Sequence, residues 1–408
     1  MSEKVDYVFL KQSAALRTYF GEICLDVPSP ETTAVVFSEI NEGTIGNLHF
    51  VPSPKYSRQS YGARVLSWAA YFISALWFVF RVKGRPLLFI VAQPPLLPAL
   101  GYLQKKLLGR RYVVWVDDVY PDVLLRRGII REGGWISRLW KAFNRVTFRN
   151  AEHVFTLSPN MLATVKQYLP KGFPATIVPT WVDTDKIYPI PRESNAWAKQ
   201  HALTQQMTIM YSGNFGATHD VECLLEAARN LRNREDLCFI FIGAGSKWET
   251  IHRSVTEHGD SNVLVLPWQP SEVLAQSLSS ADIAFVSQAK DIDGISMPSR
   301  TYYAMAAGAA IMASCAQESD LAQVVKKSDC GVIIAPGSVD EIVKTIEHLR
   351  SHPGELLMYK ENARFAAVQH YSRKLNAQVL RDALQSLTGF DTIANRQSAQ
   401  GSIQTHEV

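Results

Sequence analysis

The sequence predicts an α/β protein with two doubly wound, Rossmann-like domains. Short apolar runs rich in β-forming residues alternate with helical patterns, most clearly in the second half of the 408 residues. Such unbroken apolar runs are typical of parallel strands that are covered on both faces. The length suits two or three domains, and 47% hydrophobic with 20% charged residues is ordinary globular composition. This composition excludes disordered and fibrous proteins.

The second half shows the alternation of strands and helices most clearly. Helices are expected over 222–231, after Ser246, after Ser271 and near 298–307, with capping boxes at Ser246/Glu249 and Ser338/Glu341. Strands are expected at 207–211, 238–242, 263–266, 283–286, 310–313 and 332–335.

The first half repeats this pattern less regularly. A segment with two prolines, residues 183–194, is interpreted as the linker. The predicted domains are therefore 1–183 and 184–387, and the last helix can return to the first domain. Residues 388–408 are polar and expected to be disordered. In such a fold the natural ligand site is a cleft between the domains. Strands are expected at 7–10, 34–37, 87–91, 112–116, 153–156 and 176–178.

Charge is distributed unevenly along the chain. Residues 51–180 hold 19 Lys and Arg against 5 Asp and Glu, a difference of +14, whereas residues 181–408 hold 20 against 26. The basic half is expected to meet an anionic surface or partner. The five cysteines show no zinc or redox spacing, so they are expected to be reduced core residues of a cytosolic protein. The N-terminus has no signal-peptide pattern.

Residues 65–80 form an apolar, aromatic-rich run with basic flanks. The run is shorter than the roughly 20 residues that a spanning helix needs. One interpretation is an interfacial helix in which Trp68, Tyr71 and Trp77 anchor in the headgroup region. The alternative is a buried helix of the α/β domain, and a true transmembrane span is the least favoured reading.

Two glycine turns follow strands in the second half. The first holds Gly213, Asn214, Gly216 and His219, and the second precedes Lys247. Glycines there let backbone N–H groups approach an anion, although a tight turn without a ligand has the same pattern. Lys247 is either a nucleotide contact or a solvated side chain.

Two further segments could carry chemistry. Residues 291–310 include Pro298 before a helix of small residues, with Arg300 near its positive end, where a bound anion would explain a cation. The strand that ends at Asp117 and Asp118 could present a base or a hydroxyl contact, or simply cap a turn. The triplets Asp183/Asp185 and Asp291/Asp293 are interpreted as accidental, so no metal site is expected.

These motifs together resemble the retaining glycosyltransferases of the GT-B fold, family four, in the branch that builds exopolysaccharide and O-antigen. Within that branch, the chain resembles the fucosaminyltransferase-like and colanic-acid-transferase-like members. The resemblance runs from about Arg85 to Leu387. Its carriers are VDDVYPDVLLRRGII, AEHVFTLSPNML, IVPTWVD, YSGNFGATHDVECLLEAA, FIGAGSKW, VLPWQPSEVLAQSLSSADIAFV and SMPSRTYYAMAAG.

The resemblance implies a role for each matching position. Gly213, Asn214 and Gly216 would line the donor diphosphate, and Asp118 would face the acceptor. Residues Trp268, Gln269 and Pro270 would meet the nucleobase through their backbone. The donor sugar and phosphates would meet Ser296, Met297, Pro298, Ser299 and Arg300. Asp118 and Arg300 are therefore the predicted catalytic residues, and no cofactor is expected.

One departure from the family pattern is visible. Many members carry two glutamates eight positions apart, where this chain has Ile295 and Tyr303. The exopolysaccharide branch commonly has Pro-Ser-Lys instead, and Pro298-Ser299-Arg300 fits that pattern. Contacts deduced from the glutamates therefore do not transfer to this chain.

The resemblance implies a retaining, metal-independent hexosyltransferase that is peripheral on the inner face of the cell membrane. It would move a sugar from a nucleotide diphosphate sugar, of which a UDP-sugar is favoured, to a polyprenyl-diphosphate-linked glycan. Nucleic acid is not expected as a partner. A sugar-nucleotide epimerase of the same fold and an inactive scaffold subunit stay open as alternatives.

Overall fold

The structure is a computed structural model that describes residues 5–13, 19–40, 43–57, 61–216, 220–289 and 291–401. The chain forms two compact units. Unit 1 comprises Met1–Leu157, Leu162–Val178 and Asn376–Val408. Unit 2 comprises Ser158–Met161 and Pro179–Leu375. The main division thus falls at Val178/Pro179, five residues before the expected one, and the end of the chain belongs to unit 1.

Unit 1 contains an eight-stranded sheet in the order β3-β4-β2-β1-β5-β6-β7-β8. All its pairs are parallel except the antiparallel pair of β3 and β4. The strands are β1 (Tyr7–Leu10), β2 (Ala34–Ser38), β3 (Thr44–Ile45), β4 (Leu48–Pro52), β5 (Leu87–Val91), β6 (Tyr112–Trp115), β7 (His153–Thr156) and β8 (Ala175–Ile177).

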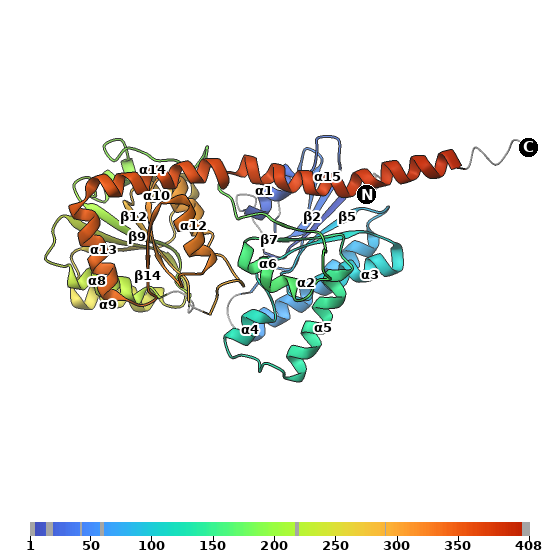
Figure 1. The fold of residues 1–408 in the computed structure, drawn as a ribbon, viewed down its shortest axis with the longest axis horizontal. Coiled ribbons are helices and arrows are strands. Elements are labelled where there is room, and N and C mark those ends of the chain that lie inside the picture. Colours follow the sequence, from blue (N-terminus) through green and yellow to red (C-terminus); the bar gives the residue numbers. More distant parts are fainter. Residues whose placement is uncertain are drawn as a thin grey trace, which may run out of the picture. The chain divides into compact units, whose positions relative to one another are not determined.

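Helices cover both faces of this sheet. In Figure 1, α1 and the earlier part of α15 lie on one side of it, and α2, α3, α5 and α6 lie on the other. This division follows from right-handed crossovers between parallel strands. The helices are α1 (Tyr19–Asp26), α2 (Tyr61–Arg81), α3 (Pro98–Leu108), α4 (Asp122–Arg126), α5 (Trp135–Arg149), α6 (Pro159–Lys166) and α15 (Arg373–Gly401).

Unit 2 contains a six-stranded, all-parallel sheet in the order β11-β10-β9-β12-β13-β14. Counted along the chain within the unit, this is the Rossmann order 3-2-1-4-5-6. The order reverses between β9 and β12. The strands are β9 (Met207–Asn214), β10 (Leu237–Ala244), β11 (Val263–Leu266), β12 (Ile283–Ser287), β13 (Ala310–Ser314) and β14 (Gly331–Ile334).

The helices of unit 2 alternate with these strands. Two parallel sheets with helical crossovers confirm the predicted α/β class and the doubly wound architecture. The helices are α7 (Ala196–Gln200), α8 (Glu222–Asn230), α9 (Trp248–His258), the 3₁₀ turn η1 (Ser271–Val273), α10 (Leu274–Ser279), α11 (Arg300–Ala306), α12 (Asp320–Ser328), α13 (Val339–Ser351) and α14 (Pro353–His370).

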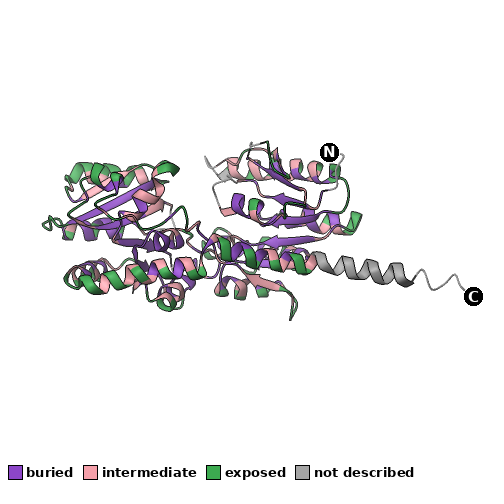
Figure 2. Ribbon diagram, turned by 90° about the horizontal axis from the view of Figure 1, so that it is seen from above, coloured by how far each residue is buried: buried purple, intermediate pink, exposed green. Residues whose placement is uncertain are grey.

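The cores lie between the sheets and their helices, as the buried strands of both units show (Figure 2). All five cysteines are buried and free, so the prediction that they are core thiols is confirmed. Each expected strand is present, with ends that differ from the predicted ones by at most three residues, but the sequence analysis missed β3 and β4. β3 has only two residues, and β4 is only partly buried, so neither shows a continuous apolar run.

The segment interpreted as a linker is fastened to unit 2. Gly308, at φ +77°, leaves space for Pro189, because a Cβ there would lie 2.8 Å from the proline ring. Arg364 of α14 donates to the carbonyls of Ile187 (2.9 Å) and Thr184 (3.1 Å). Residues 183–194 are therefore part of unit 2.

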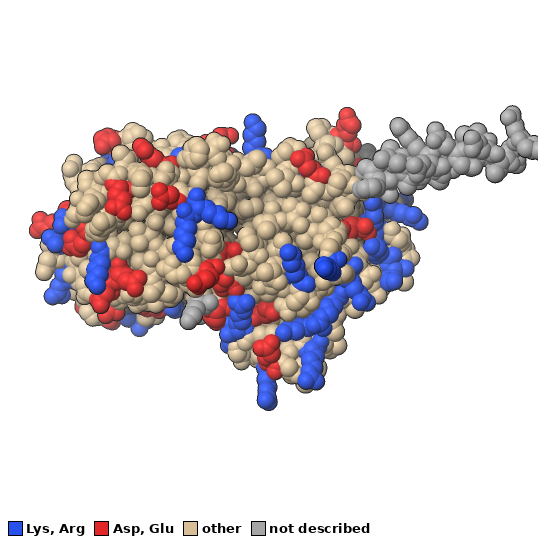
Figure 3. Space-filling model, viewed as in Figure 1, with Lys and Arg blue, Asp and Glu red and all other residues tan. Residues whose placement is uncertain are grey.

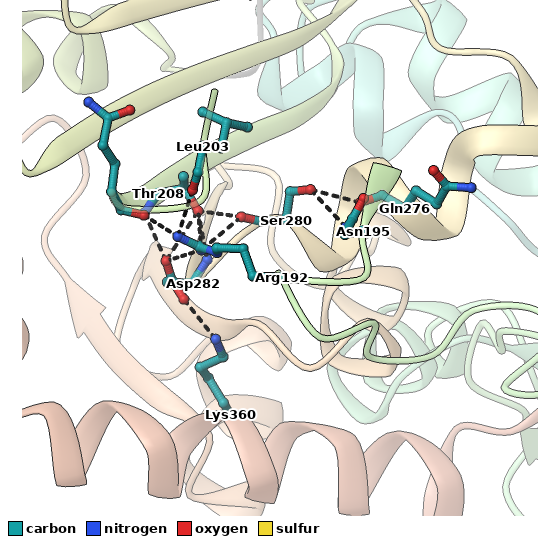
Figure 4. Close-up of polar contacts among 9 residues, drawn as sticks. Arg192, Asn195, Leu203, Thr208, Gln276, Ser280, Asp282 and Lys360 are labelled. Atoms are coloured by element: carbon teal, nitrogen blue, oxygen red, sulfur yellow. Dashed lines mark hydrogen bonds and ion pairs between the residues drawn. The ribbon is translucent and has the colours of Figure 1, made fainter. Parts of the chain in front are cut away.

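Arg192 fastens the end of this segment (Figure 4). Its guanidinium donates to Thr208 at the start of β9 (3.1 Å) and to the Ser280 carbonyl (3.2 Å), and it pairs with the Asp282 carboxylate. Lys360 of α14 pairs with the other oxygen of Asp282 at 2.7 Å. One carboxylate thus ties the segment, the sheet and α14 together.

One of the two predicted capping boxes forms a cap. Ser338 caps α13 by accepting from the Glu341 amide at 3.4 Å. Ser246 does not cap α9, which begins at Trp248 after Lys247. The Ser246 hydroxyl instead donates to the Phe215 carbonyl at 3.4 Å, so the loop after β9 takes the group that would have capped the helix.

Helix α2 presents a mostly exposed apolar surface. Among the described residues it is the one helix long and apolar enough to cross a membrane. Only 17% of its most apolar window is buried, whereas a core helix would be mostly buried. A buried stripe of Tyr71, Ala75 and Val79 faces the sheet.

The three aromatic residues predicted as interfacial anchors differ in exposure. Tyr71 is fully buried and donates to the Phe37 carbonyl at 2.9 Å, so its predicted role as an interfacial anchor is wrong. Trp77 is 61% exposed, whereas Trp68 is half-buried against Tyr120.

The last helix packs on unit 1. Arg381 of α15 donates to the Asp26 carbonyl (2.9 Å), and Arg111 donates to the Leu387 carbonyl (2.7 Å). The described backbone of α15 runs to Gly401, and the disorder expected from residue 388 stays a prediction. Residues 402–408 lie outside the described residues.

Candidate functional site

The candidate site lies at the carboxyl edge of the six-stranded sheet in unit 2. β9 and β12 are neighbours there, although their connections run in opposite directions along the sheet. Ligands of doubly wound folds bind outside the carboxyl ends of the strands at such a reversal. Gly213 and Asn214 end β9, and Ser287 and Gln288 end or follow β12.

Two glycine loops pack against each other at this edge. Gly243 at the end of β10 lies so close to β9 that a Cβ there would be 1.9 Å from the Gly213 carbonyl oxygen. The Phe215 amide donates to the Ala244 carbonyl (2.8 Å), and the Lys247 amide donates to the Phe215 carbonyl (3.1 Å). The backbone of both loops is therefore held close together, as a site that approaches a ligand through main-chain groups requires.

Arg300 joins these loops from α11. A Cβ on Gly213 would lie 3.0 Å from its Nη1, so the guanidinium rests directly on the glycine. The guanidinium also lies over the buried ring of Tyr211, 4.6 Å from the centroid. Burial raises the pKa of Tyr211 and the Arg300 charge partly offsets this, so the phenol stays neutral beside the cation. The arrangement places a positive charge beside the backbone of the Gly213 loop.

The segment before Arg300 is held from β12. Gln288 is buried and donates to the Ser296 carbonyl at 2.9 Å. Ile295 and Met297 are buried in the core, whereas Ser299 is exposed. Pro298 precedes the helix, whose first residue is Arg300. The position where many family members carry a glutamate is therefore a fully buried apolar site, and Ile295 belongs to the core.

The turn after β11 presents one exposed tryptophan. Trp268 is 55% exposed, and Pro270 immediately precedes η1. Gln269 accepts a hydrogen bond from the indole N–H of Trp197 (2.9 Å) and donates to the Pro267 carbonyl (2.9 Å). The buried Trp197 of α7 thus fixes the shape of residues 267–270.

We expect Trp197→Phe to weaken binding of a nucleotide donor about two- to ten-fold, which corresponds to the loss of one neutral hydrogen bond. The phenyl ring keeps an aromatic side chain in the buried site, although it is smaller than indole, and it cannot donate to Gln269. Steady-state kinetics should show a higher donor KM with kcat nearly unchanged. An unchanged KM accompanied by a lower melting temperature would reduce Trp197 to a packing residue.

The other predicted donor residues lie near these loops. Lys247 pairs with the Glu222 carboxylate at 2.8 Å, so its ammonium already has a protein partner. Gly216 follows the Phe215 carbonyl that accepts from Lys247. His219 lies outside the described residues. The predicted diphosphate and phosphate contacts of all these residues stay predictions.

The predicted acceptor-side carboxylates belong to unit 1. Asp117 forms an ion pair with Lys11 (2.6 Å) and accepts a hydrogen bond from the Trp115 indole (2.6 Å). These two contacts hold its carboxylate at the carboxyl ends of β1 and β6. Asp118 lies near Tyr120, where burial and then the Asp118 charge raise the phenol pKa to about 12. The catalytic role of Asp118 stays a prediction.

Four residues of these clusters had no clear signal in the sequence. Tyr211 and Gln288 support Arg300 and its preceding loop, Trp197 holds the turn after β11, and Lys11 pairs with Asp117. Lys11 and Gln288 each follow an apolar strand directly, and a polar residue at that position is a pattern that could have indicated them. Tyr211 and Trp197 read as ordinary core aromatics.

Comparison with known sequences identifies the C-terminal part. The family described as glycosyl transferases group 1 matches residues 193–365. A protein of Pseudomonas aeruginosa named as a glycosyltransferase, WbjE, is 20% identical over 278 residues, 68% of this chain and 69% of that protein. A protein of Escherichia coli K12 named for colanic acid biosynthesis glycosyl transfer, WcaI, is 27% identical over 322 residues, 75% of each.

Solved structures match nearly the whole chain. Sucrose-phosphate synthase from Thermosynechococcus elongatus gives a TM-score of 0.76 at 13% identity, covering 95% of this chain and 100% of that one. Anabaena HepE in complex with UDP-glucose gives 0.69 at 15% identity, covering 94% and 100%. At these identities the likeness shows the fold, which is GT-B. The chain as a whole thus has the GT-B fold, and residues 193–365 of it match the family of glycosyl transferases group 1.

Proposed function

We propose that this protein transfers a hexosyl residue from a nucleotide diphosphate sugar to a polyprenyl-diphosphate-linked glycan, in exopolysaccharide or O-antigen synthesis. The observation that carries the proposal is the Arg300 guanidinium resting on Gly213 at the carboxyl edge of β9. A cation beside a backbone glycine loop suits a diphosphate. UDP is the favoured nucleotide, since HepE of this fold is solved with UDP-glucose. The name of WcaI supports the polysaccharide context.

In the proposed reaction the bond between the anomeric carbon and the donor diphosphate breaks, and an acceptor hydroxyl oxygen bonds to that carbon. The nucleoside diphosphate leaves with additional negative charge, which Arg300 and the loop amides would stabilise. For a retaining course, the hydroxyl proton passes to the leaving phosphate. No side-chain base is then required, and Asp118 would serve to orient the acceptor.

A donor screen with purified full-length protein tests this proposal. Each nucleotide sugar is incubated with and without a lipid-linked glycan, and both nucleoside diphosphate release and the mass of the lipid product are measured. Acceptor-dependent release with a product one hexose heavier is expected. An epimerised free nucleotide sugar would indicate the epimerase alternative. No turnover with any donor, despite a folded protein, would favour the scaffold alternative.

We expect full activity in excess EDTA, because the Asp-x-Asp carboxylates serve structural contacts. Asp183 pairs with Lys186 (2.8 Å), and Asp293 accepts from the Asp320 amide (2.9 Å) and the Asn160 side chain (2.8 Å). Within the described residues no three His, Cys, Asp or Glu side chains group as metal ligands do. Activity that EDTA abolishes and manganese or magnesium restores would contradict metal independence.

We further propose that unit 1 docks on the inner face of the cell membrane. The outward stripe of α2 is wholly apolar, because positions 66, 73, 77 and 80 share one helical face opposite Tyr71, Ala75 and Val79. Leu66 is 72% exposed, and Trp135 and Leu139 of α5 are also exposed. Lys and Arg side chains outnumber acidic ones over the part of unit 1 that holds α2 to α5 (Figure 3). Apolar and basic groups together suit an anionic bilayer surface.

We expect the protein to bind phosphatidylglycerol vesicles, and high salt to weaken that binding without abolishing it. Each exposed base contributes about 1 kcal/mol, and salt screens that part alone. Replacing Leu66, Ile73 and Trp77 by Ser should remove the salt-resistant part in a sedimentation assay. Tyr71→Ser is the matched control, because a buried residue should cause unfolding and not detachment. Equal binding to neutral and anionic vesicles would contradict the basic contribution.

A further inference from the structure

A surface groove of about 390 Å³ runs along one flank of α2. Ile73 and Trp77 line it from the helix, and Phe37, Val51 and Pro52 line it from β2 and β4. Seven of its nine lining residues are apolar, and the polar exceptions are Ser74 and Arg81. Its volume is within the range of pockets that hold small ligands. The chemistry of this lining suits a hydrocarbon chain.

One basic side chain, that of Arg81, lines the groove, and two more follow it in the sequence. The Arg81 guanidinium lies over the Trp77 ring, 4.9 Å from its centroid, and Lys83 and Arg85 follow within four residues. All three are exposed, and within the described residues none has an ion pair with a carboxylate. An apolar groove with an arginine in its lining matches a molecule with an apolar chain and an anionic head.

The position of α2 indicates where that molecule comes from. Ile73 and Trp77 belong both to the groove and to the exposed apolar stripe of a helix whose composition suits a membrane. The groove therefore opens beside the surface that would meet the bilayer, and a lipid chain could enter without crossing water.

The groove extends along α2 from the carboxyl edge of the sheet of unit 1. Gln12 at the end of β1 donates to the Ser67 carbonyl (2.8 Å), which places the N-terminal half of α2 beside the carboxyl edge of the sheet. Arg81 is fourteen residues further on, which is roughly 20 Å along a helix. The groove nevertheless reaches that edge, because Pro54, which lines it together with Arg81, accepts from the same Gln12 side chain (3.4 Å).

We propose that the groove binds one acyl chain of an anionic phospholipid and that Arg81 holds the phosphate of its headgroup. This site deepens the proposed membrane docking and rests on it. A bound lipid would fix the rotation of α2 at the membrane, and so the direction in which the carboxyl edge of the sheet faces. The bulk bilayer is the proposed source of this lipid, because the groove opens beside the exposed apolar stripe of α2.

Photocrosslinking tests the site in the full-length protein. Vesicles of phosphatidylcholine with phosphatidylglycerol that bears a diazirine on its acyl chain are irradiated, and the adducts are mapped by mass spectrometry. Adducts should concentrate on residues 73–78 and 51–54. Ser74→Phe fills the groove and should lower these adducts at least ten-fold while vesicle binding persists. The matched control Ala70→Phe adds the same ring on the exposed stripe and should leave the adducts unchanged.

A second pair of variants tests the headgroup contact. Arg81→Gln should reduce groove adducts from phosphatidylglycerol about five-fold, which corresponds to one basic contact. Lys106→Gln is its control, since Lys106 also lies over an exposed-face aromatic ring, that of Tyr102 (5.8 Å). If Ser74→Phe fails to fold by circular dichroism, Val51→Phe blocks the groove from its other wall.

Three outcomes would overturn the proposal. Adducts spread along the exposed stripe and unchanged by either blocking variant would mean that the bilayer merely touches α2. Equal labelling by a neutral diazirine lipid, insensitive to Arg81→Gln, would remove the phosphate contact. Preferential labelling by a polyprenyl phosphate probe would assign the groove to the acceptor. Because none of these readouts uses sugar transfer, failure of the site is distinct from failure of the proposed function.

Discussion

Arg300→Ala is expected to lower sugar transfer about ten- to a hundred-fold while the protein stays folded. The guanidinium rests on Gly213 at the carboxyl edge of β9, where the donor diphosphate is proposed to bind. A hydrogen bond to a charged group contributes about 1.5–3 kcal/mol, which corresponds to this range of rates. The loss should appear in kcat/KM measured by nucleoside diphosphate release.

Two further variants make the Arg300 result specific. Arg300→Lys keeps the charge but not the planar fork, so it should restore only part of the activity. Arg253→Ala removes an exposed arginine from α9 and should change nothing. The melting temperature should be measured for each variant, because Arg300 also packs on Tyr211. Wild-type activity in a folded Arg300→Ala protein would remove Arg300 from the donor site.

Asp282→Asn is expected to lower the free energy of unfolding of unit 2 by about 3 kcal/mol. The carboxylate pairs with both Arg192 and Lys360, so its neutralisation leaves two partly buried cations without their partner. Breaking a buried pair costs about 3–5 kcal/mol, and the partial exposure of both cations favours the lower end. The melting temperature should fall by about 6–12 °C in a unit of this size. Asp236→Asn, which breaks a surface pair with Arg350, should cost less than 1 kcal/mol.

The same carboxylate predicts a pH dependence of stability. Burial raises the pKa of Asp282, but the Lys360 and Arg192 charges outweigh it and hold that pKa below its usual value. The stabilisation is therefore complete above the unfolded pKa of about 3.9, and it is lost as the pH falls through the lower folded pKa. Urea titrations should show the difference between wild type and Asp282→Asn shrinking below about pH 4. A constant difference down to pH 2 would contradict the role of this charge.

The sequence alone pointed to residues of the candidate site, but not to the residues that pack against them or pair with them. Glycine turns directly after apolar strands are local features, so Gly213 and Arg300 could be named from the chain alone. Their proximity, and the Tyr211 ring beneath the guanidinium, depend on strand order in the sheet. Lys247 was named for the same local reason, yet its ammonium pairs with Glu222 from another helix. Long-range pairing of this kind leaves no pattern in a single sequence.

By itself, the sequence determined the α/β class, nearly every strand, the buried cysteines and the motifs of the family, because burial on both faces of a parallel strand requires a continuous apolar run. Only the tertiary structure decided which side of α2 is covered. Tyr71 and Trp77 are both aromatic residues of one apolar run, but they are six residues apart, about 120° around the helix, and so point to different sides of it. Packing against Phe37 buries the first and leaves the second exposed. Likewise, the segment 183–194 reads as a free linker until Arg192 meets Asp282, ninety residues away.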